Sequence, residues 1–227
     1  MKYLNHVFKG DRMSILLDKI KGLIGGSELE SIIKEFSDTI DAEKKLVKES
    51  KERINSLIAY SKVETPTLRE AIESLGNTFE NIDHAREEKI DQMLEKFIAP
   101  LNILLEEFKK LSAEIRESEK AKKDLEKSKS KLSKLKAKPK EKLKPGQMDN
   151  AENAVKDAEK EVTTKEKEAK EASEVFNRKK LETMKAVLDD IITIEKDFHE
   201  KVIGFMTNAK KKTDAIDLDE KPAEVPE

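Results

Sequence analysis

The sequence predicts an all-α protein, built as an elongated antiparallel three-helix coiled coil with kinked long helices. Two observations lead to this prediction. Charged residues make up 41% of the 227 residues and aromatic residues only 4%, which is typical of long, solvent-exposed helices. Apolar residues also return in alternating steps of three and four over very long stretches, the period of a helix packed against other helices.

The first long helix is expected between Ser27 and Thr65, where neither Gly nor Pro occurs. Its apolar positions keep the helical period: Leu29, Ile33, Phe36, Ile40, Val47, Ile54 and Leu57. At about 1.5 Å per residue, such a helix would be roughly 55 Å long. Gly25-Gly26 in front of it indicates a kink or break, because glycine weakens a helix.

The second helix has the longest pattern and is expected from Pro66 to Lys138. Thr65 and Pro66 suit the N-cap and the first helical position, so the helix is expected to begin there. Pro100 is the predicted helix kink, because proline removes a backbone donor and crowds the preceding turn. Beyond Ile115 the apolar stripe thins, so the distal part of this helix can bury less surface.

Two prolines and a glycine in residues 139–147 predict a turn, after which a third helix is expected from about Met148 to Lys212. The first half of this helix carries small apolar residues and the second half bulky ones. The two lean segments therefore flank the same turn, which predicts an antiparallel arrangement with a thin tip and a thick base. The base holds more apolar surface than one three-helix layer needs, so self-association is expected there.

The chain is thus divided into an N-terminal amphipathic segment, residues 1–14, a helical domain, residues 15–212, and an acidic tail, residues 213–227. The tail contains prolines and is expected to be disordered. A secretory signal is not expected, because the N-terminus lacks an unbroken apolar core followed by a small-residue cleavage site.

The N-terminal segment has an apolar face bordered by basic residues. The apolar side chains on that face are Tyr3, Leu4, Val7 and Phe8. Bulky apolar residues on a basic helix are typical of a segment that lies in a membrane interface, so these four residues are predicted to insert into a bilayer. The alternative is a frayed terminus, or a short helix that packs on its own protein.

Residues 120–144 form the most strongly charged part of the chain, with twelve lysines against three acidic residues. The whole chain has a net charge of −2, so this net of nine positive charges is locally segregated. Near an anionic leaflet each lysine contributes about 1 kcal/mol of binding free energy, and the attraction decays within a Debye length. The predicted lipid-binding residues at this tip are Lys127, Lys129, Lys131, Lys134, Lys136, Lys138, Lys140, Lys142 and Lys144.

A solvated lysine-rich hairpin without a partner is the alternative explanation of this cluster. Nucleic acid is the other polyanion to consider, but the segment has neither aromatic side chains to stack on bases nor arginine to read them. We therefore expect an anionic phospholipid membrane as the partner, and no nucleic acid.

Catalysis has little support in the sequence. The three histidines, His6, His84 and His199, do not have the spacing of metal ligands, and no glycine-rich phosphate loop is present. The chain has no cysteine, which removes thiol nucleophiles and fits a reducing compartment. No apolar run approaches about 18 residues, so no membrane-spanning helix is expected. We expect a protein that is not an enzyme and that holds no cofactor or metal.

The sequence resembles the BAR (Bin/amphiphysin/Rvs) domain, and specifically its N-terminally extended, amphiphysin- and endophilin-like form. The similarity extends from Met1 to about Lys212. It rests on LLDKIKGLIGGSELE at 16–30, LGNTF at 75–79, FIAPLNILLEEF at 97–108 and EKDFHEKVIGFM at 195–206, together with the order of helix lengths and the basic tip.

This resemblance implies a crescent-shaped homodimer whose concave face and tips bind anionic bilayers. The implied function is to sense or induce membrane curvature, as in membrane trafficking or endocytosis, and the implied location is cytoplasmic, as a peripheral membrane protein. Some members of the family bind a small GTPase. The alternative expectation is therefore a coiled-coil protein-interaction module that does not remodel membranes.

Overall fold

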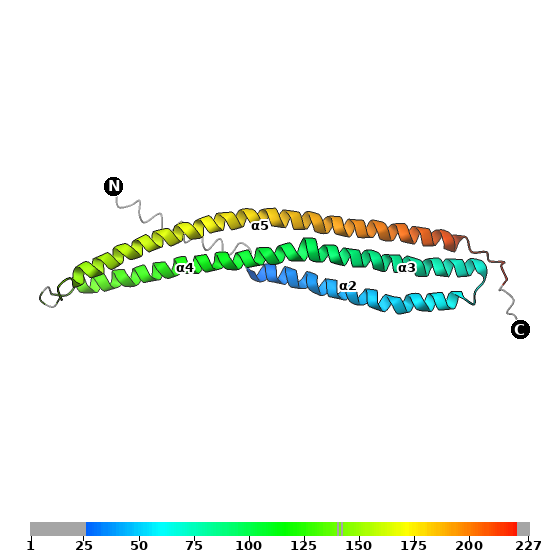
Figure 1. Ribbon diagram of the computed structural model, residues 1–227, viewed down its shortest axis with the longest axis horizontal. Helices are drawn as coiled ribbons and strands as arrows, with labels where there is room; N and C mark the ends of the chain where they lie inside the picture. Colours follow the sequence, from blue (N-terminus) through cyan, green and yellow to red (C-terminus); the bar gives the residue numbers. More distant parts are fainter. Residues whose placement is uncertain (1–25, 140, 142, 222–227) are drawn as a thin grey trace. The chain divides into compact units, whose positions relative to one another are not determined.

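The computed structural model describes residues 26–139, 141 and 143–221, and within these ranges all regular structure is helical (Figure 1). The elements are α2 (Gly26–Ser61), α3 (Pro66–Met93), a π-helical turn η1 (Leu94–Ile98), α4 (Ala99–Lys136) and α5 (Gln147–Asp214). The prediction of an all-α fold with three long helices is confirmed. The segment 1–14, with the proposed inserting residues, lies outside the described residues.

The contacts divide the chain into two units. Of the described residues, a three-helix unit contains 31–102 and 183–221, and a hairpin unit contains 26–30 and the described part of 103–182. The two units pack differently. Apolar side chains form the core of the three-helix unit, whereas in the hairpin unit ion pairs between the helices accompany fewer buried apolar side chains toward the turn.

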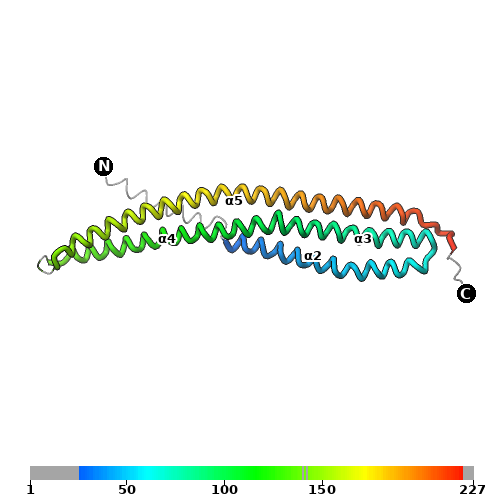
Figure 2. Tube along the Cα trace, in the orientation of Figure 1, coloured from blue at the N-terminus to red at the C-terminus, as the bar shows by residue number. Residues whose placement is uncertain are grey.

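The three-helix unit packs α2, α3 and the second half of α5 around one core, and the three helices are drawn side by side in Figure 2. Ile40, Met93 and Val187, one from each helix, are at most 2% exposed. Phe36 of α2 and Phe97 of η1 add a tilted ring pair with centroids 4.4 Å apart. The apolar stripes that define the helical period in the sequence are therefore the buried faces.

Gly76 lies where α3 packs closely on α2. A Cβ atom at this position would lie 2.9 Å from Cδ1 of Ile58, the end of a flexible side chain. A small rotation of Ile58 would relieve that contact, so Gly76 marks a close approach of the two helices without being required for it.

The interruption of the second long helix lies just before Pro100. The N–H of Ala99 donates to the carbonyl of Leu94, five residues back, so the turn η1 contains one residue more than an α-helical turn. Proline crowds the carbonyl of the preceding turn, and a wider turn relieves that contact. Phe97 and Ile98 of the turn are buried, so the irregularity lies within the core.

Arg69 closes the connection between α2 and α3. Its guanidinium group donates to the carbonyl oxygens of Ser61, Lys62 and Glu64, at 3.1, 3.0 and 3.3 Å. These carbonyls belong to the last residue of α2 and to the connection after it, where the helix itself offers no donors. The predicted start at Pro66 is also confirmed.

The C-terminal segment caps the start of α3. Thr65 occupies the N-cap position but makes no side-chain cap hydrogen bond. Instead, the N–H and the hydroxyl of Thr67 donate to Oε2 of Glu220, at 2.8 and 2.6 Å. These bonds, with a further contribution from Thr65, lower the pKa of Glu220. Within the predicted tail, α5 continues to Asp214 and Glu220 makes this specific contact.

The hairpin unit pairs α4 with the first half of α5 in antiparallel orientation, as predicted (Figure 1). Phe108 and Phe176 form a tilted ring pair with centroids 5.8 Å apart, and Leu111, Ile115 and Ala169 of the same two helices are buried. The turn at the tip uses Gly146 in the left-handed region, with φ at 72°, directly before α5 begins.

Candidate functional site

Three lysines at the tip form ion pairs between the two helices of the hairpin unit. Each pair joins a lysine of α4 to a glutamate of α5: Lys122 with Glu166 at 2.9 Å, Lys129 with Glu159 at 3.3 Å, and Lys136 with Glu152 at 3.5 Å. A step of seven residues along α4 is matched by a step of seven back along α5. We call these six residues the zipper. They are one reason why α4 and α5 adopt a single antiparallel register.

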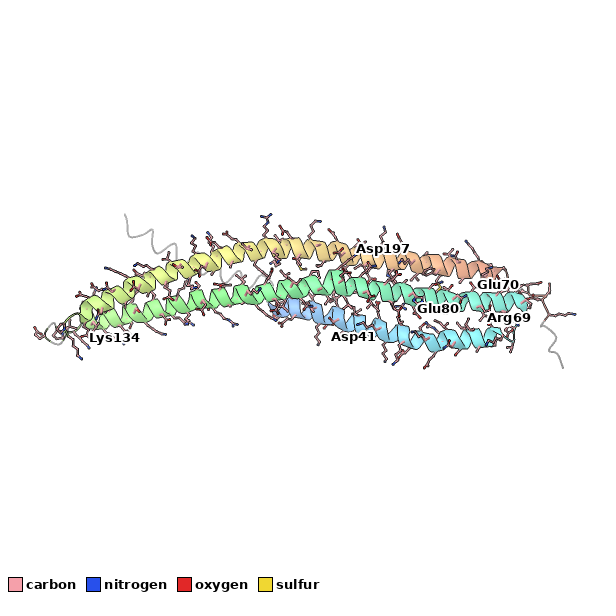
Figure 3. All side chains as sticks on the ribbon, in the orientation of Figure 1. Asp41, Arg69, Glu70, Glu80, Lys134 and Asp197 are labelled. Carbon is pink, nitrogen blue, oxygen red and sulfur yellow. The ribbon has the colours of Figure 1, made fainter. Side chains whose placement is uncertain are left out.

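From Arg116 to the end of α4, the basic residues outside the zipper lie on a different face. At 100° per residue, these six residues fall within about 80° of arc, and the zipper lysines lie about 160° away. Together with Lys138, which follows the end of α4, we call them the ridge; its members are Arg116, Lys120, Lys123, Lys127, Lys131, Lys134 and Lys138. All seven are exposed. Figure 3 labels Lys134 near the turn that joins α4 to α5.

The ridge carries almost uncompensated charge. Lys127 is its only member with an ion pair within the described residues, to Asp124 at 2.8 Å. The hydrogen bond from Lys127 lowers the pKa of Asp124, and the nearby charges of Lys127 and Lys120 add to the effect. Because its basic side chains are exposed, the ridge presents a row of positive charges along several turns of helix.

The predicted lipid-binding lysines therefore divide by position. Four of them, Lys127, Lys131, Lys134 and Lys138, belong to the ridge, whereas Lys129 and Lys136 belong to the zipper. Lys144 lies in the turn, where its N–H donates to the Gln147 side chain, and Lys140 and Lys142 lie outside the described residues.

Sequence reasoning did not select Arg116, Lys120 and Lys123, which extend the ridge away from the turn. Their signal was available in the sequence, because they continue the three- and four-residue spacing of the other ridge members. The spacing is obscured in the sequence because the zipper lysines lie between the ridge residues. Only the ion pairs with α5 show which lysines belong to which face.

A second charged cluster lies inside the three-helix unit. The side chain of Lys89 is 7% exposed, and its ammonium group contacts Glu43 of α2 at 2.8 Å and Glu195 of α5 at 2.9 Å. It also lies 4.8 Å from the centre of the Phe198 ring. Burial alone would lower the pKa of Lys89, but the hydrogen bonds to both glutamates outweigh burial and raise it. This cation joins all three helices of the unit.

Two adjoining hollows of about 460 and 330 Å³ lie between α2 and α3 in the same unit. Both are lined by Val47, by Lys51 on the α2 side and by Glu87 on the α3 side. Asp83 also lines the smaller hollow and is 7% exposed, and its Oδ2 has no hydrogen-bond partner. We call the two hollows together the groove. Val47, Ile54 and Ile90 form its apolar floor, and its walls carry lysines on the α2 side and carboxylates on the α3 side.

The described residues offer little that resembles a metal site or a membrane span. Within them, no group of three or more His, Cys, Asp or Glu side chains is arranged to hold a metal ion. None of the helices in the same ranges is long and apolar enough to cross a membrane.

Comparison with solved structures identifies the fold. The BAR domain of amphiphysin from Drosophila matches with a TM-score of 0.73 at 13% identity, over 90% of this chain and 92% of that one. The N-terminal I-BAR domain of IBARa from D. discoideum matches with a TM-score of 0.57 at 14% identity, over 89% and 88% of the two chains. At such low identity these matches establish the BAR fold alone.

Comparison with protein families is more specific. The model of the FAM92 protein family, a family that contains BAR domains, matches residues 3–222. The match covers nearly the whole chain, including both units and the tip. The chain therefore belongs to the FAM92 protein family.

Proposed function

We propose that this protein is a peripheral membrane-binding scaffold that senses or induces curvature of anionic bilayers, and that the ridge is its lipid-contacting surface. The proposal is carried by one observation: the zipper uses three tip lysines for structure, while the ridge keeps six basic residues exposed on one face of α4, followed by Lys138. Neither α4 nor α5 needs these ridge charges for its own packing.

The ridge is suited to a flat polyanion. At about 1.5 Å per residue, the helical part of the ridge from Arg116 to Lys134 is roughly 27 Å long, enough to contact several lipid headgroups at once. With about 1 kcal/mol per basic residue near the surface, the ridge can supply several kilocalories per mole of attraction. Because the charges are exposed, this attraction weakens with salt.

The proposal includes two further elements. The first is a homodimer, supported by an exposed apolar face on α5 in the three-helix unit: Leu188, Ile192, Ile203 and Met206. The second is a shallow wedge formed by Tyr3, Leu4, Val7 and Phe8, as in the N-terminally extended BAR form. A cytoplasmic location and a role in membrane trafficking or endocytosis belong to the same proposal.

Vesicle co-sedimentation with two matched triple variants tests the role of the ridge. The ridge variant is Lys123→Gln, Lys131→Gln and Lys134→Gln, and the zipper variant is Lys122→Gln, Lys129→Gln and Lys136→Gln. Both remove three positive charges from α4 of the full chain. With vesicles of phosphatidylcholine and phosphatidylserine, the ridge variant should bind roughly 100-fold more weakly than the wild-type chain.

The zipper variant should lose much less affinity, because its lysines are already paired with glutamates. Circular dichroism of both variants must show unchanged helix content, so that the comparison reports on the surface rather than on folding. Equal losses of affinity in the two variants would sink the assignment to the ridge. Absence of binding by the wild-type chain would sink the membrane proposal itself.

A coiled-coil protein-interaction module is the second candidate function, and the groove between α2 and α3 is the observation that favours it. Its floor and its oppositely charged walls suit an amphipathic segment of a partner such as a small GTPase. Titration with purified small GTPases at about 0.15 M and about 0.5 M salt separates the two functions, because lipid binding should vanish at the higher salt. Binding that persists there and is lost in Asp83→Asn would favour the protein partner.

A further inference from the structure

Three serines are interleaved with the tip lysines, and the structure places them in three different environments. Ser128 is partly buried, whereas Ser130 and Ser133 are exposed. At 100° per residue, Ser130 lies about 60° from the centre of the ridge and Ser133 about 120° from it. Ser133 is adjacent to the zipper side of α4, since Lys129 and Lys136 are four residues before it and three residues after it.

Ser130 is the serine whose neighbours belong to the ridge. Lys127 lies three residues before it and Lys134 four residues after it, the spacings at which helical side chains meet. Several helical serines and threonines, such as Ser112 and Thr163, donate their hydroxyl groups to the carbonyl four residues earlier. Ser130 is exposed, and its hydroxyl makes no hydrogen bond within the described residues.

We propose that Ser130 is a phosphorylation site that controls the affinity of the ridge for anionic lipid. The reaction is phosphoryl transfer from ATP by a protein kinase that selects serine preceded by basic residues. The Ser130 hydroxyl oxygen forms a bond to the γ-phosphorus, the bond to the β-phosphate oxygen breaks, and ADP and a proton are released. The inference rests on the proposed membrane function, because it names the regulation of the same surface.

The local sequence and packing permit this reaction. Lys127 and Lys129 lie at the third and first positions before Ser130, so a kinase with an acidic substrate groove has two basic residues to recognise. The last turns of α4 bury little apolar surface, since Leu132 and Leu135 are only partly buried. Segments with few buried contacts open locally at low free-energy cost, which gives a kinase access to the extended backbone.

Phosphate at Ser130 acts on the ridge in two ways. Its charge of nearly −2 cancels about two of the positive charges that attract an anionic leaflet. Its oxygens also accept hydrogen bonds from Lys134, which has no ion pair within the described residues, and compete with Asp124 for Lys127; both lysines are at helical contact distance, and this holds their ammonium groups away from lipid. Because each lysine near the leaflet is worth a factor of about five in affinity, the modified chain should bind roughly 30-fold more weakly.

The position of Ser133 supplies the matched control. A phosphate there carries the same charge one turn away, but its helical neighbours Lys129 and Lys136 already pair with Glu159 and Glu152. It should therefore weaken lipid binding less than phosphate at Ser130. It should also loosen the hairpin, because it competes with the two glutamates for the zipper lysines.

The experiment uses the full chain with phosphoserine incorporated at one position, either 130 or 133, and the unmodified chain beside them. Binding to vesicles of phosphatidylcholine and phosphatidylserine is measured by co-sedimentation at about 0.15 M salt. We expect a fall of roughly 30-fold for phosphoserine at 130 and a clearly smaller fall for phosphoserine at 133. In parallel, the unmodified chain is incubated with ATP and a basophilic serine kinase, and mass spectrometry locates the phosphate.

The outcomes separate the role of Ser130 from the proposed membrane function. Unchanged binding with phosphoserine at 130, or equal losses at both positions, would overturn the inference while leaving membrane binding intact. Absence of phosphate on Ser130 after kinase treatment would overturn it as well. If the unmodified chain does not bind vesicles at all, the proposed function fails, and the inference fails with it.

Discussion

At the scale of single residues, Lys89 shows how a buried charge can specify a packing arrangement. Its ammonium group contacts Glu43 and Glu195, so one cation connects α2, α3 and α5. A buried ion pair adds little net stability over an apolar replacement, but removal of one partner leaves uncompensated charge. We infer that Lys89 selects the relative register of the three helices, which apolar side chains alone leave less well defined.

Substitution of Lys89 tests this role. Lys89→Ala should lower the free energy of unfolding by about 3 kcal/mol, because Glu43 and Glu195 lose their common partner. The double variant Lys89→Met with Glu43→Met should recover most of that loss. Urea denaturation followed by circular dichroism measures the free energy of unfolding of both variants.

In the wild type, the pKa of Lys89 is raised. The contribution of Lys89 to the free energy of unfolding is therefore complete below about pH 10.4, the ordinary lysine value, and is lost as the pH rises through the raised pKa.

Lys44→Ala is the matched control, because Lys44 is an exposed lysine on α2 with only a surface ion pair to Asp41. Its loss should change the free energy of unfolding by less than about 0.5 kcal/mol. An equally small effect of Lys89→Ala would contradict the role assigned to the buried cation.

At the scale of elements, the pairing of α4 with α5 depends increasingly on charge toward the tip. Near Phe108 and Phe176 the two helices are held together by aromatic and aliphatic side chains. Toward the turn, Leu132 and Leu135 are only partly buried, and the zipper pairs accompany them. Exposed ion pairs contribute about 0–1 kcal/mol each, so they specify register more than they add stability.

Charge reversal tests the zipper as an element. Reversal of Lys122, Lys129 and Lys136 to Glu should place like charges opposite each other and separate the ends of α4 and α5. Amide hydrogen exchange in the last three turns of α4 should become faster, because these turns lose partners on α5. Reversal of Glu152, Glu159 and Glu166 to Lys in the same chain should restore slow exchange. Failure of the compensating changes to restore it would show that the three ion pairs do not determine the register.

At the scale of the whole molecule, the exposed apolar residues indicate how copies of the chain associate. Leu188, Ile192, Ile203 and Met206 are between 41% and 65% exposed, and they fall within about 60° of arc on α5. A soluble chain rarely leaves such a row uncovered. In the proposed homodimer, a second copy of the chain covers this row.

Analytical ultracentrifugation tests this surface. Ile192→Glu combined with Ile203→Glu should raise the dimer dissociation constant at least about 100-fold, because each change places a charge in an apolar contact. Val175→Glu is the matched control, because Val175 is 68% exposed on the same helix but lies on a different face. A similar effect of Val175→Glu would show that the apolar row is not the contact between copies.

The spacing of apolar residues in the sequence predicted the helices and their order correctly. The starts at Pro66 and near Gln147 and the antiparallel hairpin follow from caps, breakers and apolar spacing, which are local properties of the chain. The π-helical turn before Pro100 and the close approach at Gly76 could not be predicted, because both depend on what a neighbouring turn or helix occupies. The contact of Glu220 with Thr67 joins residues far apart in sequence, so no local pattern indicates it.

The sequence by itself determined that this protein is built from long helices and that its positive charge is gathered at one end. Composition and the spacing of apolar residues are enough for both conclusions. Only the tertiary structure decided which lysines are committed to the fold and which remain exposed. Lys129 and Lys131 look equivalent in the sequence, yet the first pairs with Glu159 of α5 and the second lies on the ridge. The physical reason is that an ion pair needs a partner within a few ångströms, and packing of the two helices determines which face of α4 has one.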